Sequence, residues 1–173
     1  MNQDIHTYLT RVAESDITAL DTIYNVLSVR IFNYARTIVK TKETAEDVTH
    51  DVFMRVYSLS ARLAAMENPT AYIMVITRNL AYDHLKRNKF VALDEVYEAT
   101  TNPYSMLPDA LAGLPPNQRE TIYLLHICGF TQKEVAKIMG VPLVTVKWRN
   151  KKAKQRLIEY FKPEEGGDYS ETL

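Results

Sequence analysis

The chain contains, at residues 131–156, the segment TQKEVAKIMGVPLVTVKWRNKKAKQR. Thr131 and Glu134 have the spacing of a capping box, which predicts a helix that begins directly after Thr131. Gly140 suits the end of that helix because glycine adopts the left-handed conformation without strain. Pro142 then opens a last helix that continues past the end of the segment. A short capped helix, a glycine turn and a basic helix together predict a helix-turn-helix.

The expected last helix, which we place at 143–161, is strongly basic. Six cations lie on it before any acid: Lys147, Arg149, Lys151, Lys152, Lys154 and Arg156. A helix fits the major groove of DNA, where cations neutralise phosphates and the N-terminal side chains contact base edges. The candidates for this contact are Thr145, Lys147, Trp148, Lys151 and Lys152. A solvated basic face is the alternative, and Trp148 suits either a DNA contact or packing on the neighbouring helix.

Three apolar stripes predict amphipathic helices in the first half of the chain, because their members recur every three or four residues. After a short leader, Asp16 caps a helix with the stripe Leu20, Ile23, Leu27, Ile31, Tyr34 and Ile38. Thr41 caps a second helix with the stripe Ala45, Val48, Val52, Val56 and Leu59. Asn68-Pro69 starts a third helix that runs to about Arg87, with Ile73, Ile76 and Leu80 facing inward.

These patterns predict an all-α protein with two small helical domains. Residues 1–88 are expected to form a three-to-four-helix bundle, and residues 107–161 a helix-turn-helix domain. Residues 89–106 have no helical period and contain the turn cluster TTNP, so we expect a flexible linker. Residues 162–173 form an acidic tail.

The composition argues against an enzyme or a secreted protein. Formal net charge is zero, and a single cysteine cannot form an internal disulfide. The N-terminus does not have the pattern of a signal peptide, and no stretch is apolar enough for direct membrane insertion, so we expect a cytoplasmic protein. The histidines lack metal spacing, and we find no phosphate-binding loop or nucleophile motif. We therefore expect no catalytic residue, metal or cofactor.

The second expected helix carries an acidic stripe. Glu43, Asp47 and Asp51 are spaced at i, i+4 and i+8, and beside them lie Glu46, His50 and Met54. Like charges at this spacing repel one another, and a basic protein partner would offset the repulsion. An ordinary solvated face is the alternative.

The third expected helix carries a mixed stripe made of Tyr72, Val75, Asn79, Tyr82 and Lys86. Aromatic rings stack on unpaired bases, amides contact base edges and cations hold phosphates, so this stripe suits single-stranded nucleic acid. Half-buried packing of the tyrosines is the alternative.

Three segments together resemble one family. AEDVTHDVFMRVY resembles the core-binding segment of extracytoplasmic-function (ECF) sigma factors of bacterial RNA polymerase, and NPTAYIMVITRNLAYDHLKR resembles their promoter-melting segment. LPPNQRETIYLLHICGFTQKEVAKIMGVPLVTVKWRNKKAKQRL resembles their minus-thirty-five domain. The three segments span about residues 17–161, in the order and spacing of the family.

The resemblance implies roles for the matching residues. It implies that Asp47, His50 and Asp51 bind the clamp of the largest polymerase subunit, and that Tyr72 and Asn79 contact minus-ten DNA with help from the loop 60–67. By their places on the same stripes we add Met54 to the polymerase-binding residues and Tyr82 and Lys86 to the minus-ten residues. It implies that Lys147, Trp148, Lys151 and Lys152 contact the minus-thirty-five element, to which the helix pattern adds Thr145, while Arg149 holds its backbone. It also implies contact with the flap of the second-largest subunit and an anti-sigma factor, often membrane-anchored.

The sequence departs from the family at several of these positions. The departures are His50, Tyr72, Met74, Val75, Val144, Trp148 and Asn150, and those in the last helix imply a divergent minus-thirty-five motif. A helix-turn-helix regulator with an N-terminal sensory or dimerisation domain is the alternative function. Such a dimer would give two-fold symmetric footprints, whereas a sigma factor is expected to leave duplex DNA unprotected without the core enzyme.

Overall fold

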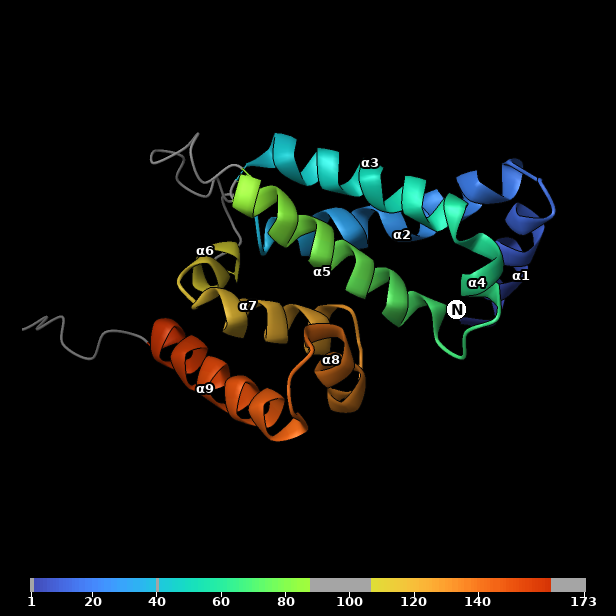
Figure 1. The fold of residues 1–173 in the computed structure, drawn as a ribbon. Coiled ribbons are helices and arrows are strands. Elements are labelled where there is room, and N and C mark those ends of the chain that lie inside the picture. The colour runs from blue at the N-terminus through green and yellow to red at the C-terminus, as the bar shows by residue number, and fades with distance from the viewer. Residues whose placement is uncertain (1, 40, 88–106, 163–173) are drawn as a thin grey trace, which may run out of the picture.

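The computed structural model describes residues 2–39, 41–87 and 107–162, and these residues form helices joined by short turns (Figure 1). The first half contains α1 (Asn2–Ala13), α2 (Thr18–Arg36), α3 (Lys42–Ser58), α4 (Ser60–Ala64) and α5 (Pro69–Arg87). The second half contains α6 (Leu107–Ala112), α7 (Pro116–Ile122), the π-helical turn η2 (Tyr123–Ile127), α8 (Gln132–Met139) and α9 (Leu143–Phe161). The all-α prediction is confirmed for the described residues.

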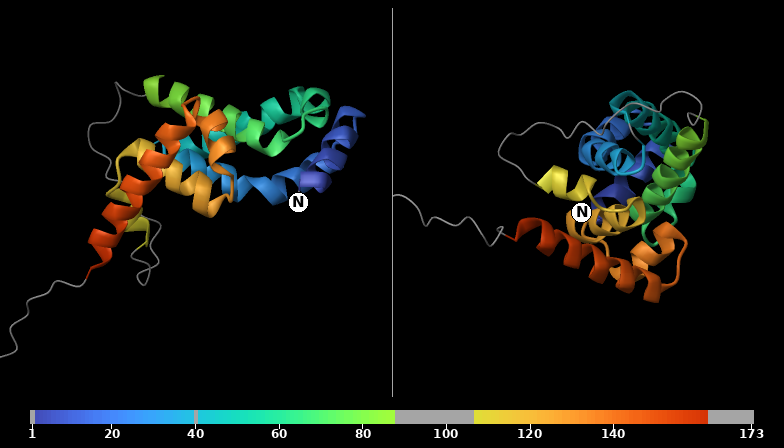
Figure 2. Two further views of the ribbon diagram at one scale, coloured as in Figure 1. Left: turned by 90° about the horizontal axis from the view of Figure 1, so that it is seen from below. Right: turned by 90° about the vertical axis from the view of Figure 1, so that its left-hand side faces the viewer.

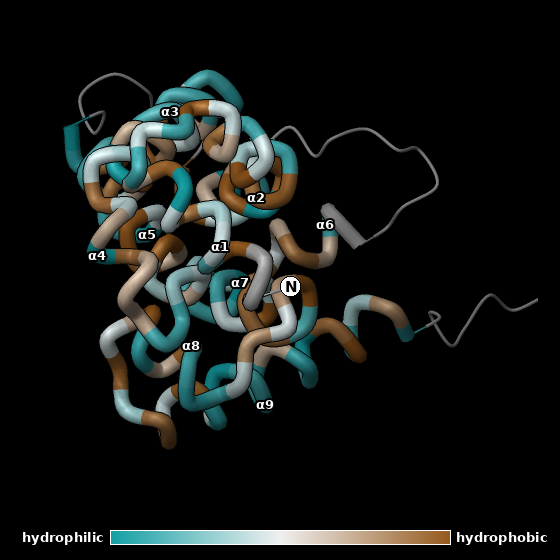
Figure 3. The backbone as a smooth tube through the Cα atoms, turned by 90° about the vertical axis from the view of Figure 1, so that its right-hand side faces the viewer, coloured by the Kyte–Doolittle hydropathy of each residue, from teal (hydrophilic) through white to brown (hydrophobic). Residues whose placement is uncertain are grey.

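The helices α1 to α5 form one unit, here called the N-terminal bundle, in which α2, α3 and α5 lie side by side (Figure 1). The predicted stripes face its interior, with Ile23, Leu27 and Ile31 of α2 and Val48 and Val52 of α3 buried. Figure 3 shows the corresponding alternation of hydrophobic and hydrophilic positions along the helices.

The predicted caps at the starts of α3 and α5 are confirmed. Thr41 Oγ1 accepts a hydrogen bond of 3.1 Å from the Thr44 backbone N–H. Asn68 Oδ1 accepts one of 3.0 Å from the Ala71 backbone N–H. Each bond satisfies a donor that would otherwise have no partner within the helix.

Two segments are more ordered than the sequence analysis expects. The leader before Asp16 contains α1, which packs against α2 and α4 and buries Ile5, Leu9 and Val12. The expected loop 60–67 begins with the short helix α4, in which Leu63 is fully buried. The helix in the leader was not predicted, although Ile5, Leu9 and Val12 have the spacing of one helical face.

The helices α6 to α9 form a second unit, here called the C-terminal unit. Thr131 and Glu134 make both hydrogen bonds of the predicted capping box at the start of α8. Gly140 ends α8 in the left-handed conformation with φ 64°, and Gly129 has φ 74° after η2. The turn at Gly140 leads directly into α9, which confirms the predicted helix-turn-helix.

The two units pack directly against one another, which the sequence analysis does not predict. The helix α8 contacts α5, and one hydrophobic core contains residues of both units, among them Tyr34 and Ile73 with Tyr123 and Leu124. Figure 2 shows the C-terminal unit lying across the face of the bundle. The expected linker 89–106 and the acidic tail after Lys162 lie outside the described residues.

The left-handed glycine at the helix-turn-helix corner gives a stability prediction. Gly140→Ala should lower the free energy of unfolding by about 1–2 kcal/mol, because a Cβ strains this conformation. No heavy atom lies within 4 Å of the added Cβ, so conformational strain alone sets the cost. Urea denaturation measures it.

Gly113→Ala is the matched control for this prediction. An added Cβ there lies 3.6 Å from the Ala110 carbonyl oxygen, an ordinary contact, and Gly113 is not among the glycines with positive φ. Its free energy of unfolding should not fall. Equal losses for the two variants would contradict the account of the Gly140 turn.

Candidate nucleic-acid interface

The helix α9 presents a continuous exposed face of apolar, aromatic and basic side chains. Val146 and Ala153 are buried on its inner side, and this fixes which side chains point outward. On the outer side Val144 and Trp148 are exposed, as are Lys147, Lys151 and Lys152. Trp148 is 54% exposed, which favours a DNA contact over packing on the neighbouring helix.

The cations of α9 are free of acidic partners within the part of the chain that the structure describes. Arg149 and Thr145 are half-buried at the edge of the exposed face. Arg156 is exposed but donates a hydrogen bond of 2.8 Å to Gln118 Oε1 of α7. His126 Nε2 lies 3.0 Å from Asn150 Oδ1 and ties the unusual residue Asn150 to η2. The outer lysines thus remain available to phosphates.

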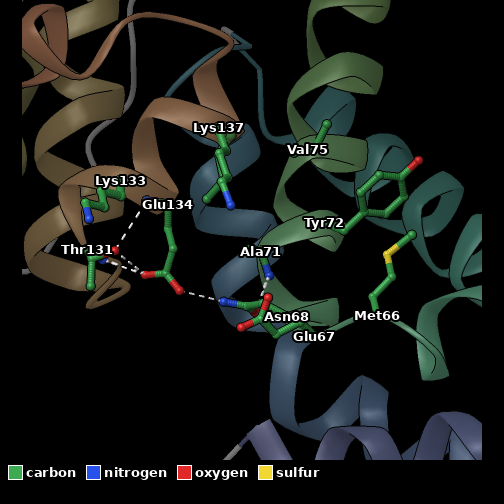
Figure 4. A pocket seen from close by; sticks show the side chains of 11 residues that line it. Met66, Glu67, Asn68, Ala71, Tyr72, Val75, Thr131, Lys133, Glu134 and Lys137 are labelled. Carbon is green, nitrogen blue, oxygen red and sulfur yellow. Dashed lines mark hydrogen bonds between the residues drawn. The ribbon is translucent and has the colours of Figure 1, made fainter.

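The start of the α5 stripe lines a cleft between the two units (Figure 4). Tyr72 and Val75 form the bundle side of this cleft, which has a volume of about 620 Å³, and Lys133 and Lys137 of α8 form the other side. Figure 4 shows Glu134 reaching across to Asn68, whose Nδ2 donates a hydrogen bond of 2.6 Å to Glu134 Oε1. In this arrangement α8 lies over the part of α5 that carries Tyr72.

The rest of the α5 stripe lies in a second hollow. Asn79, Tyr82 and Lys86 line it together with Arg78 and Asp83. Asn79 and Lys86 are exposed, but the Tyr82 hydroxyl donates a hydrogen bond to Glu120 of α7. Burial, and next the charge of Glu120, raise the pKa of Tyr82 to about 12. Among these stripe residues, Tyr82 is therefore already bound to Glu120 of the C-terminal unit.

A buried carboxylate joins the two units, and no pattern in the sequence predicts it. Glu120 is fully buried on α7 and accepts hydrogen bonds from three bundle side chains, those of Tyr34, Arg78 and Tyr82. Burial, and next the charge of Glu120, raise the pKa of Tyr34 well above its ordinary value. Burial acts to lower the Arg78 pKa, but Glu120 together with Tyr34 and Tyr82 outweighs burial, so the pKa is raised. We call these four residues the Glu120 cluster.

The acidic stripe of α3 lies on the surface as predicted. Glu43, Asp47 and Met54 are exposed, and so is His50. Asp51 differs from them because its Oδ2 lies 2.9 Å from Nε2 of His84 on α5. Asp51 therefore helps to hold α3 on α5, whereas the side chains of Glu43, Asp47 and Met54 point into solvent.

An apolar hollow between α2 and α3 lies beside the acidic stripe. Its volume is about 540 Å³, and its lining includes Tyr24, Val29, Phe32 and Phe53 together with His50. The rings of Tyr24 and Phe53 are 4.7 Å apart, and Val29 is largely exposed at the rim. Val26 and Val29 lie outside the predicted buried stripe of α2, and these unexplained apolar positions could have indicated the hollow from the sequence.

Metal-binding clusters and membrane-spanning helices are both absent from the residues that the structure describes. No group of His, Cys, Asp and Glu side chains there could hold a metal ion. Among the described helices, none combines the length and hydrophobicity needed to cross a bilayer.

Two family models match the chain. The model for Sigma-70 region 2 matches residues 23–91, and that for Sigma-70 region 4 matches residues 104–157, so together they cover more than half of the chain. The first contains α3 and α5 with their surface stripes, and the second contains the helix-turn-helix.

Curated relatives point to the same family. The chain is 27% identical over 148 residues to the ECF RNA polymerase sigma factor BldN of Streptomyces coelicolor, a match that covers 75% of this chain and 55% of BldN. It is 29% identical over 147 residues to the ECF RNA polymerase sigma factor SigE of Mycolicibacterium smegmatis, covering 76% and 57%. The chain thus spans little more than half the length of these two relatives.

A solved structure has the same fold. The sigma factor RpoE of Bartonella quintana, in complex with the anti-sigma factor NepR, superposes with a TM-score of 0.71 at 24% sequence identity. The match covers 83% of this chain and 97% of that one. The chain therefore belongs to the sigma-70 family, in the group of ECF sigma factors.

The single tryptophan of the chain makes α9 directly observable. At low salt, mixed-sequence duplex DNA should quench the Trp148 fluorescence through non-specific phosphate contacts that leave no discrete footprint, because the exposed indole lies among the outer lysines. If about four cations reach phosphates, log affinity should fall against log salt with a slope of roughly −3 to −4. Unchanged emission at saturating DNA, followed in parallel by anisotropy of a labelled duplex, would place the contact elsewhere.

Proposed function

We propose that this protein is an alternative sigma factor that binds core RNA polymerase in the cytoplasm and directs it to a specific set of promoters. The observation that carries the proposal is the α9 face, held outward by the capped helix α8 and the left-handed Gly140. A helix presented this way fits the major groove, with its N-terminal side chains on the bases. The protein acts through binding alone, and the polymerase performs the chemistry.

The polymerase-binding surface in this proposal is the α3 face. Asp47, His50, Asp51 and Met54 contact the clamp of the largest subunit, and the apolar hollow next to them supplies hydrophobic contact area. Apolar contacts give affinity while the surrounding charges select a basic partner and its orientation. The C-terminal unit contacts the flap of the second-largest subunit.

The promoter contacts in this proposal are divided between two helices. Tyr72, Asn79, Tyr82 and Lys86 of α5 hold unpaired minus-ten bases by stacking, amide contacts and phosphate pairing. On α9, Thr145, Lys147, Trp148, Lys151 and Lys152 contact the minus-thirty-five bases, and Arg149 contacts the backbone. Val144 is largely exposed at the start of α9 and adds an apolar contact for a thymine methyl group.

We further propose that this protein binds an anti-sigma factor, which in this family is often membrane-anchored. The structure of RpoE with NepR supports it, because that sigma factor shares the fold of this chain. The anti-sigma factor would hold this protein away from polymerase until a signal releases it.

Transcription with core polymerase tests the proposal. The protein should direct core enzyme to discrete start sites in a genomic DNA library, and core enzyme alone should not. Transcripts without discrete start sites, together with two-fold symmetric footprints of the protein alone, would favour the dimeric regulator instead.

Charge reversal tests the α3 surface. Glu43→Lys with Asp47→Lys should reduce core binding by at least about tenfold, because both carboxylates are exposed and face the proposed partner. Asp51 is left unchanged because it bonds to His84. Fluorescence anisotropy with labelled protein measures the affinity.

The control for this charge reversal is Glu14→Lys, an exposed acid beyond the end of α1. It changes net charge in the same direction without touching α3, so its affinity for core should stay near that of the wild type. Normal core binding by the double variant would rule out the α3 face.

A promoter-selection experiment distinguishes the α9 cations that contact bases from the one that contacts the DNA backbone. Lys151→Ala or Lys152→Ala should change the preferred minus-thirty-five bases by about 1–3 kcal/mol where a base contact is lost. Arg149→Ala should weaken all promoters to a similar extent, because a backbone contact carries no sequence information. Transcription of a randomised minus-thirty-five library measures both effects, and three variants with wild-type preference and strength would refute the assignment.

A further inference from the structure

The Glu120 cluster joins the C-terminal unit to the helix that carries the minus-ten stripe. Glu120 Oε2 accepts hydrogen bonds of 3.0 Å from Nε of Arg78 and 3.3 Å from the hydroxyl of Tyr34. Its other carboxylate oxygen accepts from the Tyr82 hydroxyl. All three donors come from the N-terminal bundle, so the carboxylate keeps them only while the two units are in contact.

Arg78 belongs to the same surface as the proposed minus-ten residues. It lines one hollow with Asn79, Tyr82 and Lys86, and its guanidinium carbon lies 4.6 Å from the centre of the Tyr82 ring. A guanidinium stacked on a tyrosine beside an exposed amide is a suitable site for a nucleotide, with the base on the ring and the phosphate on the cation. In this structure the carboxylate of Glu120 takes the place that a phosphate would take.

We propose that Arg78 is a phosphate-binding residue for unpaired promoter DNA, and that Glu120 masks it by occupying its guanidinium until the two helical units separate. This inference rests on the proposed role of α5 in contacting minus-ten DNA. The free chain then holds its minus-ten surface closed, because Arg78 and Tyr82 cannot contact DNA while they hold Glu120. The second contact, from Asn68 to Glu134, covers the Tyr72 end of the same helix.

Cys128 is a native reporter of the separation. It is the only cysteine of the chain and is buried at the end of η2. Burial raises the pKa of its thiol to about 11, and the charge of Arg30 on the bundle acts in the opposite direction. Reaction of Cys128 with a thiol reagent should therefore accelerate when the units part.

The first experiment measures opening. Glu120→Gln keeps the side-chain volume and removes the charge that pairs with Arg78, and it should raise the Cys128 labelling rate by about tenfold. Tyr34→Phe removes one donor to Glu120 without changing charge and should raise the rate by a smaller factor. Glu14→Gln makes the same change in net charge far from the cluster and should not change it. Circular dichroism confirms that each variant remains folded.

The second experiment measures the masked site. Anisotropy follows binding of a mixed-sequence single-stranded oligonucleotide to the full chain. Glu120→Gln should increase the affinity, by at most about the factor by which labelling accelerates, since the α5 contacts depend on the open fraction. Arg78→Ala should accelerate labelling as Glu120→Gln does, yet bring no gain in affinity. The double variant should behave like Arg78→Ala. The exposed lysines of α9 contribute equally in all four proteins.

Each result supports or overturns the proposal. Unchanged labelling in folded Glu120→Gln and Tyr34→Phe would show that the cluster does not hold the units together. Faster labelling without higher affinity in Glu120→Gln, or equal gains in Glu120→Gln and Arg78→Ala, would show that Arg78 is not the phosphate ligand. Failure of the wild-type protein to support transcription would remove the proposed function but would not alter the labelling rates, so the two failures are distinguishable.

Discussion

A carboxylate with no solvent contact needs partners, and Glu120 finds all of its side-chain partners on the other helical unit. Removing a charge from water costs several kcal/mol, which a guanidinium and two hydroxyl donors offset when they are well placed. Removal of one partner from a buried pair typically costs about 3–5 kcal/mol. The stacked rings of Tyr34 and Tyr123, with centroids 5.9 Å apart, pack beside this polar centre and extend the contact. The relative placement of the two units therefore depends on Glu120 together with the apolar core that the units share.

This placement gives α5 two incompatible uses. Its outer face packs on the C-terminal unit through Arg78 and Tyr82, and the same two residues belong to the surface proposed to contact nucleic acid. The face of α9 is under no such restriction, since Trp148 and the outer lysines are exposed in the closed chain. The acidic stripe of α3 is likewise exposed. The closed chain thus presents its proposed polymerase and minus-thirty-five surfaces while the proposed minus-ten surface is partly covered.

The sequence predicts the local features well because their causes are local. The capping box from Thr131 to Glu134, the left-handed Gly140 and the Asn68 cap each depend on residues within a single turn. The Glu120 cluster could not be predicted in this way, because its bonds join residues 38 to 86 positions apart in the chain. Glu120 stands directly before the segment TIYLL, and an acid next to apolar residues hints at burial, but the sequence does not show which residues would pair with it. The roles of the α3, α5 and α9 surface residues remain predictions, since they concern molecules outside this chain.

The most direct test of this account is the distance between the two units, measured by double electron–electron resonance. Spin labels at Asn25→Cys on α2 and Lys154→Cys on α9, with Cys128→Ser, occupy exposed positions on the two units. The account predicts one short, narrow distance distribution in the free protein and a longer distance once core polymerase and promoter DNA are bound. A broad distribution in the free protein, or the same short distance in the promoter complex, would contradict it.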